Sequence, residues 1–198
     1  DIVTSGNHIW DQKEIVSFID DEPFLIRPAN YPEGAPGKGY CIYPFKAKNI
    51  GVINVSGRTF MPPMDCPFQK VDEILKEIKN QCDIILVDIH AEATSEKIAM
   101  GFYLDGKVTC VVGTHTHVQT ADNRILPKGT AYISDLGMVG PYNSSLGINV
   151  NNAIDKFITC RPVRFEMAEG PNIFSAVVLE LAEDNSVKSF ERILFNEE

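Results

Sequence analysis

The chain has 198 residues and a formal net charge of −9, from 18 Lys plus Arg against 27 Asp plus Glu. This length suits one α/β domain with a buried core, so we expect a single domain over residues 1–198. The acidic balance argues against a duplex nucleic acid partner, which needs a basic face, and no apolar run approaches the ~20 residues of a membrane helix.

In the first half of the chain, the pattern of apolar residues predicts alternating strands and helices. A helix is indicated where apolar residues recur at i, i+3, i+4 and i+7, and a buried strand where they are continuous. Prolines and glycines indicate a long surface loop. The expected elements are a strand over 2–5, a helix over 11–20 capped by Asp11, a loop over 23–40, a strand over 50–55 and a helix over 71–78.

The second half continues the alternation and then changes to strands. The expected elements are a strand over 84–87 that stops at His90, a strand over 107–112, a short strand over 131–134, a helix over 152–158, and strands between 163 and 195 with turns at 169–170 and 184–185. Alternating strands and helices favour an α/β fold with a parallel sheet.

Five scattered cysteines show no C-x-x-C spacing. They therefore indicate neither a zinc knuckle nor a redox pair, and reduced thiols in a cytoplasmic protein are the interpretation. The chain starts at Asp1, and residues 1–4 have the pattern of the later part of a strand. We expect the N-terminus to be incomplete.

All four histidines, His8, His90, His115 and His117, directly follow a predicted strand. Ligands of open α/β sheets bind beyond the carboxyl ends of the strands. A single histidine is more often structural or merely exposed, but the shared position of all four favours a site.

Two short motifs indicate how such a site would work. In an extended segment His115 and His117 point the same way, and imidazoles bind Zn, Mn and Fe. In Gly6-Asn7-His8, the Asn7 amide oxygen could complete a metal shell while His8 points the other way, free to act as an acid. A plain Gly-Asn turn is the alternative.

Six further side chains could serve a phosphate site, each with a plainer alternative: Arg58, Arg124, Glu92, Asp135, Trp10 and Phe60. The arginines could pair with phosphate oxygens or be solvated. The carboxylates could orient a metal-binding imidazole or lie on the surface. The rings could stack on a base, but core packing is the favoured interpretation.

In order, Gly6-Asn7-His8, His90 and the segment 113–117 resemble the later motifs of calcineurin-like metallophosphoesterases. More narrowly, the chain resembles the YmdB family of bacterial 2′,3′-cyclic-nucleotide 2′-phosphodiesterases. The stretches that carry this resemblance are 6–11, 27–30, 57–60, 90–97 and 113–129. It implies a metallophosphoesterase-like layered sheet sandwich flanked by helices. The family's first Asp motif and its Gly-Glu-Asn motif are not present, so the first strand–helix units are expected to be missing.

The resemblance also implies roles for individual residues. Asn7, His90 and His115 would bind one divalent metal ion and His117 a second, with Fe, Mn and Zn all suitable. His8 would protonate the leaving sugar oxygen of a small cyclic nucleotide. Without the earlier carboxylates the fragment itself is expected to bind metal poorly.

Two other functions stay open. The chain could be a metallophosphoesterase for another phosphoester, or a non-catalytic regulatory or interaction module with the same fold. A homo-oligomer is compatible with either function.

Overall fold

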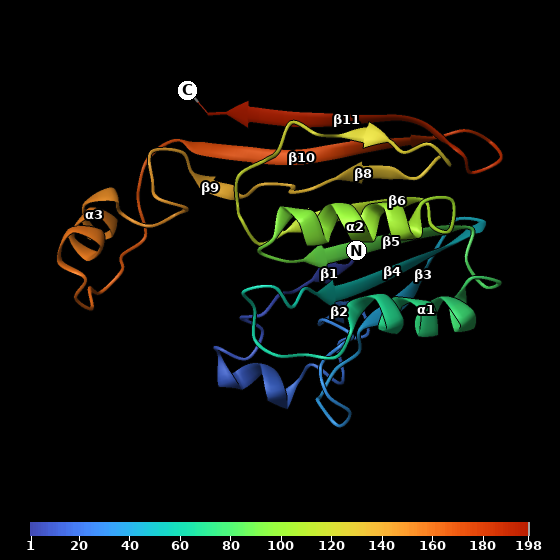
Figure 1. The fold of residues 1–198 in the computed structure, drawn as a ribbon, viewed down its shortest axis with the longest axis horizontal. Coiled ribbons are helices and arrows are strands. Elements are labelled where there is room, and N and C mark those ends of the chain that lie inside the picture. The colour runs from blue at the N-terminus through green and yellow to red at the C-terminus, as the bar shows by residue number, and fades with distance from the viewer. Residues whose placement is uncertain (198) are drawn as a thin grey trace.

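A six-stranded mixed sheet forms the centre of the computed structural model, which describes residues 1–197 (Figure 1). Its strands are β3 (Tyr40–Phe45), β4 (Lys48–Ser56), β5 (Ile84–His90), β6 (Cys110–Thr114), β7 (Arg124–Ile125) and β8 (Ala131–Ile133), in the spatial order β3-β4-β5-β6-β8-β7. The four middle strands run parallel, and β3 and β7 are antiparallel edges.

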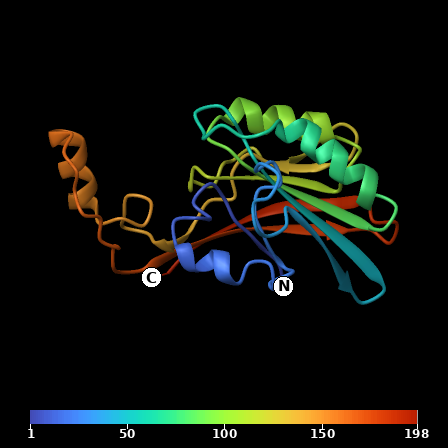
Figure 2. The same cartoon turned by 90° about the horizontal axis from the view of Figure 1, so that it is seen from below.

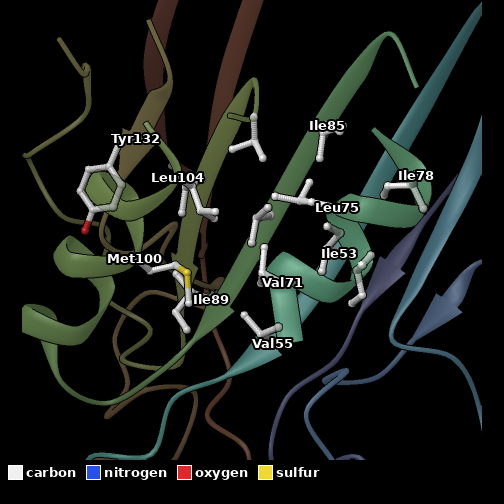
Figure 3. Packing of buried hydrophobic residues seen from close by; sticks show 14 of the residues in the cluster. Ile53, Val55, Val71, Leu75, Ile78, Ile85, Ile89, Met100, Leu104 and Tyr132 are labelled. Atoms are coloured by element: carbon white, nitrogen blue, oxygen red, sulfur yellow. The ribbon is translucent and has the colours of Figure 1, made fainter. Parts of the chain in front are cut away.

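Two helices, α1 (Pro67–Ile78) and α2 (Thr94–Leu104), cover one face of this sheet (Figures 1 and 2). α1 buries Val71, Ile74, Leu75 and Ile78, the spacing that places apolar residues on one helical face. Figure 3 shows this face meeting side chains of β4 and β5, with Met100 and Leu104 of α2 alongside. The main core therefore lies between the sheet and these helices.

A second sheet covers the opposite face. Its strands are β9 (Val139–Pro141), β10 (Asn172–Leu181) and β11 (Val187–Asn196), in the antiparallel order β11-β10-β9. Phe190 of β11 packs with Cys110, Ala131 and Ile133 of the central sheet. Helices, central sheet and second sheet thus form three layers (Figure 2), which confirms the predicted α/β layered class.

The remaining elements lie at the edges of these layers. β1 (Val3–Thr4) and β2 (Leu25–Ile26) form a small parallel pair, and a 3₁₀ helix, η1, covers Lys13–Ser17. α3 (Val150–Thr159) stands apart from the sheets in both views (Figures 1 and 2). Among the described residues, no helix is long and apolar enough to cross a membrane.

One N-terminal prediction was wrong, and a second was confirmed only in part. The helix predicted over 11–20 is only the 3₁₀ turn η1, and Gln12 rather than Asp11 precedes it. The predicted loop over 23–40 contains β2 and buries Arg27, whose guanidinium donates to the carbonyls of Pro28, Ala35 and Pro36. The hydrogen bonds from the Arg27 guanidinium to these backbone carbonyls, rather than regular secondary structure, stabilise this segment.

Five elements were not predicted: β2, β3, α2, β7 and β9. Strands β7 and β9 have two and three residues, too few for a periodic pattern. Predicted bounds also moved, since β5 continues to His90 and the strand expected over 107–112 is β6 at Cys110–Thr114. Residues 163–171, expected to begin the last strands, form no regular strand.

Candidate metal centre

The strand register brings the histidine loops together. Ser56, His90 and Thr114 are paired neighbours across β4, β5 and β6, so these strands end level with one another. His115 follows β6 directly, and the segment after β1 delivers Asn7 to the same edge. Asn7 and His90, which are 83 residues apart along the chain, thus meet at the carboxyl end of the sheet.

Asn7, His90 and His115 converge on one point. Asn7 Oδ1 lies 2.8 Å from His90 Nε2, and His115 Nδ1 lies 3.1 Å from the same nitrogen. The two imidazole rings meet edge to face, with centroids 4.8 Å apart. Gly6 makes this possible, because a Cβ there would lie 2.3 Å from the His90 ring.

Both converging imidazoles favour their neutral form. Burial lowers the pKa of His90 to about 4, and the neighbouring His115 and Lys97 contribute to this lowering. Burial also lowers the pKa of His115, against the opposing effect of Glu92. A neutral imidazole is the form that binds a metal ion.

The segment that carries His115 and His117 is turned rather than extended. Both residues have positive φ, 103° and 66°, so the prediction that an extended strand would align them was wrong. Asp135 holds the turn between them, since its Oδ2 accepts from Thr116 N (3.0 Å) and Thr116 Oγ1 (2.7 Å). The same carboxylate pairs with the buried Lys97 at 2.8 Å.

His117 is exposed and follows His115 by two residues. Within residues 1–197, no group of three or more His, Cys, Asp or Glu side chains is placed to hold a metal ion. The described residues thus give His117 no ligand set of its own.

His8 points to a different partner from its neighbour Asn7. Its Nδ1 lies 2.9 Å from Asp11 Oδ2, and both side chains are largely exposed, at 75% and 66%. Since a carboxylate can only accept, the His8 Nδ1–H donates to Asp11 and leaves Nε2 available. This arrangement suits a group that exchanges protons with a bound molecule.

The donors at the convergence point fit a metal ion. Two imidazole nitrogens and an amide oxygen form a borderline N/O set suited to Fe, Mn or Zn. Three protein ligands leave coordination positions open for a substrate or water. Asn7, His90 and His115 therefore suit one divalent ion, and the described residues supply a single candidate ligand, His117, for a second.

Glu92 and Asp135 both touch the imidazole loops. Glu92 Oε2 lies 3.0 Å from His115 Nε2, and Asp135 is buried and organises the turn at Thr116. For both carboxylates these contacts support the orienting interpretation over an ordinary surface position. Glu96 was missed: its carboxylate accepts from the backbone N–H groups of Arg58 and Thr59 and fixes the loop after β4.

Three of the other candidate side chains, Arg124, Trp10 and Phe60, have different surroundings. The Arg124 guanidinium stacks over the rings of Phe102 and Tyr132, a packing role. Trp10 meets Tyr31 edge to face at 5.8 Å, as expected for packing. Phe60 is 90% exposed at a φ of 60°, so the prediction that it packs in the core was wrong.

A layered α/β sheet thus gathers two imidazoles and an amide at the carboxyl edge of its strands, the edge at which such sheets bind ligands. The chain belongs to the YmdB-like protein family, whose model matches residues 1–193. It is 55% identical over 200 residues to the 2′,3′-cyclic-nucleotide 2′-phosphodiesterase of Bacillus subtilis (strain 168), covering all of this chain and 75% of that protein.

Two solved structures have the same fold. A hypothetical protein from Thermus thermophilus has a TM-score of 0.94 and 42% identity, over all of this chain and 77% of that chain. A novel phosphatase from Mycoplasma pneumoniae has a TM-score of 0.90 and 35% identity, over 99% of this chain and 72% of that chain.

Proposed function

We propose that the protein is a metal-dependent phosphodiesterase that hydrolyses 2′,3′-cyclic nucleotides to 3′-nucleotides in the cytoplasm. The convergence of Asn7, His90 and His115, beside an exposed His8, carries this proposal. The substrate class follows from the name of the Bacillus subtilis relative. The cytoplasmic location is supported by the five free cysteines.

The residues divide into two roles. Asn7, His90 and His115 would hold one divalent ion, and His117 would contribute to a second. When bound, such ions polarise phosphoryl oxygens and lower the pKa of a bound water. Attack of water on phosphorus breaks the bond to the 2′ oxygen, and His8 supplies the proton that this oxygen takes up.

Asp11 supports the acid role of His8. By accepting from Nδ1 at a distance of 2.9 Å, its carboxylate fixes the ring orientation and the tautomer of His8. The proton on Nε2 is then the one available to the leaving group. The hydrogen bond of His8 goes to Asp11, whereas Asn7, His90 and His115 contact one another. Removal of the His8 imidazole should therefore leave the metal ligands in place.

The experiment compares His8→Ala with wild type on two substrates. We expect turnover of 2′,3′-cyclic AMP to fall by about 10²–10⁴-fold, the usual contribution of a general acid. Hydrolysis of bis(p-nitrophenyl) phosphate should fall far less, because nitrophenolate leaves without a proton. Metal affinity measured by calorimetry should stay unchanged, and Gln12→Ala, on the same exposed turn, is the matched control.

Equal losses on the two substrates would contradict the acid role of His8. A chain that binds no divalent ion even when the family's Asp and Gly-Glu-Asn motifs are supplied ahead of Asp1 would contradict the metal-dependent function as a whole. That result would favour the alternative, a non-catalytic module with the same fold. The same alternative is supported by the lack, within residues 1–197, of any group of three or more His, Cys, Asp or Glu side chains placed to hold a metal ion.

A further inference from the structure

A buried carboxylate lies beneath His90. Asp88 is two residues earlier on β5, so its side chain lies on the same side of the sheet. It is 4% exposed, and its two oxygens accept from different neighbours. Oδ1 accepts from Thr114 Oγ1 at 2.8 Å, and Oδ2 accepts from Asn54 Nδ2 at 3.1 Å.

The Thr114 hydroxyl joins this carboxylate to the imidazole. Thr114 Oγ1 lies 3.0 Å from His90 Nδ1. A hydroxyl has one proton, and here Asp88 receives it. The Thr114 oxygen therefore acts as the acceptor toward His90, and the proton between them belongs to His90 Nδ1.

This hydrogen count fixes which nitrogen of His90 can bind a cation. With the proton on Nδ1, Nε2 presents a lone pair toward Asn7 and His115. His115 is fixed in the complementary way, because its Nε2 donates to Glu92 and its Nδ1 keeps the lone pair. Three lone-pair atoms then face one another, at 2.8 and 3.1 Å from His90 Nε2.

We propose that Thr114, oriented by Asp88, is a positioning residue that holds His90 as the Nδ1–H tautomer and so presets Nε2 for a divalent ion. The identity of the ligand as a divalent ion rests on the proposed function. The tautomer of His90 does not depend on that function, because in the metal-free chain the Asn7 amide can rotate so that its NH2 group donates to His90 Nε2. The opposite tautomer would leave Nδ1 and Thr114 Oγ1 as two acceptors 3.0 Å apart. Rotation of the Asn7 amide can relieve its contact with Nε2, whereas the Thr114 hydroxyl cannot turn its proton to His90 while it donates to Asp88.

The first test measures metal affinity by calorimetry with Mn²⁺ and Zn²⁺ at a fixed, mildly alkaline pH. Thr114→Val keeps the shape and removes the hydroxyl, and we expect a loss of about 10–100-fold, as for other outer partners of metal-binding histidines. Thr114→Ser restores the hydroxyl and should recover affinity to within about threefold. Thr109→Val, just before the start of β6, is the matched control and should leave affinity unchanged.

The second test reads the tautomer directly from ring ¹⁵N chemical shifts of the metal-free chain, with His90 assigned by its loss in His90→Gln. Wild type should show the proton on Nδ1, and Thr114→Val should move it to Nε2. Asp88→Asn keeps the size of the side chain and should also move the His90 proton to Nε2. The reason is that the new amide can donate to Thr114 Oγ1, and the Thr114 hydroxyl can then donate its own proton to His90 Nδ1.

The outcomes separate the two proposals. A wild-type His90 protonated on Nε2, or a Thr114→Val chain that binds metal as tightly as wild type, overturns the positioning role. A chain that shows the Nδ1–H tautomer but binds no metal, even when the family's Asp and Gly-Glu-Asn motifs are supplied, keeps the positioning role and overturns the proposed function.

Discussion

Gly6 and His90 lie so close together that only a residue without a side chain fits. A Cβ at residue 6 would come within 2.3 to 2.7 Å of three atoms of the His90 ring, well inside van der Waals contact. The ring is also held from behind by Thr114, which restricts its movement away from Gly6. The arrangement of the metal ligands therefore depends on this glycine.

Gly6→Ala should weaken metal binding by about tenfold or more, on the order of the loss seen when a ligand's supporting contact is removed. The physical reason is displacement of either the His90 ring or the Asn7 segment. Titration calorimetry measures the affinity. Gly34→Ala is the control for a strained glycine substitution without a clash, because Gly34 has a φ of 89° but nothing lies within 4 Å of its Cβ position. Unchanged affinity in Gly6→Ala would contradict this packing.

The ion pair between Lys97 and Asp135 is almost fully buried, at 2% and 1% exposure. Lys97→Met leaves the Asp135 charge without its partner, so we expect a loss of about 3–5 kcal/mol in the free energy of unfolding. Denaturant unfolding measures this loss. Lys70→Met removes the exposed pair with Glu73 and should cost about 1 kcal/mol or less. Equal losses would contradict a structural role for the buried pair.

At the scale of elements, α1 stabilises the core through one apolar face. Ile74, at 5% exposure, packs in the cluster between this helix and the sheet. In denaturant unfolding, Ile74→Ala should therefore cost about 2–5 kcal/mol through lost burial and the cavity that remains. Lys76→Ala, on the exposed face of the same helix, should change stability by about 0.5 kcal/mol or less. Comparable effects of the two would contradict the burial pattern.

Elements with strong internal patterns could be predicted from the sequence. The periodicity of α1 and the continuous apolar run of β5 each depend on a single segment, and both predictions were confirmed. The helix α2 was missed because its apolar residues do not form one clear stripe, with Gly101 packing directly on the Tyr132 ring.

The residues of the candidate site also fall into those that the sequence predicted and those that it did not. Because parallel strands end at a common edge, the strand ends predicted one site for all four imidazoles. Of these, His90 and His115 are in contact, whereas His8 pairs with Asp11. Asp88, Lys97 and Glu96 were not predicted, because their partners lie on other strands and loops. Such contacts depend on register and helix placement, which no local pattern contains.

At the scale of the whole molecule, α3 carries an apolar face that the described chain leaves exposed. Val150, Ile154, Phe157 and Ile158 are all exposed, with Phe157 at 79% and Ile158 at 77%. Their spacing of four, seven and eight residues places them on one side of the helix. Exposed apolar patches of this kind commonly mark association surfaces.

The three converging side chains of the proposed metal site lie far apart along the chain, at residues 7, 90 and 115. In the proposed function, an ion held between them would act as a crosslink that exists only in the folded state. By mass action, a free ion concentration about a hundred times the dissociation constant raises the free energy of unfolding by about 2.7 kcal/mol. Resistance to heat would then report cation supply, so that depletion of the ion exposes the chain to unfolding and degradation as well as to loss of activity.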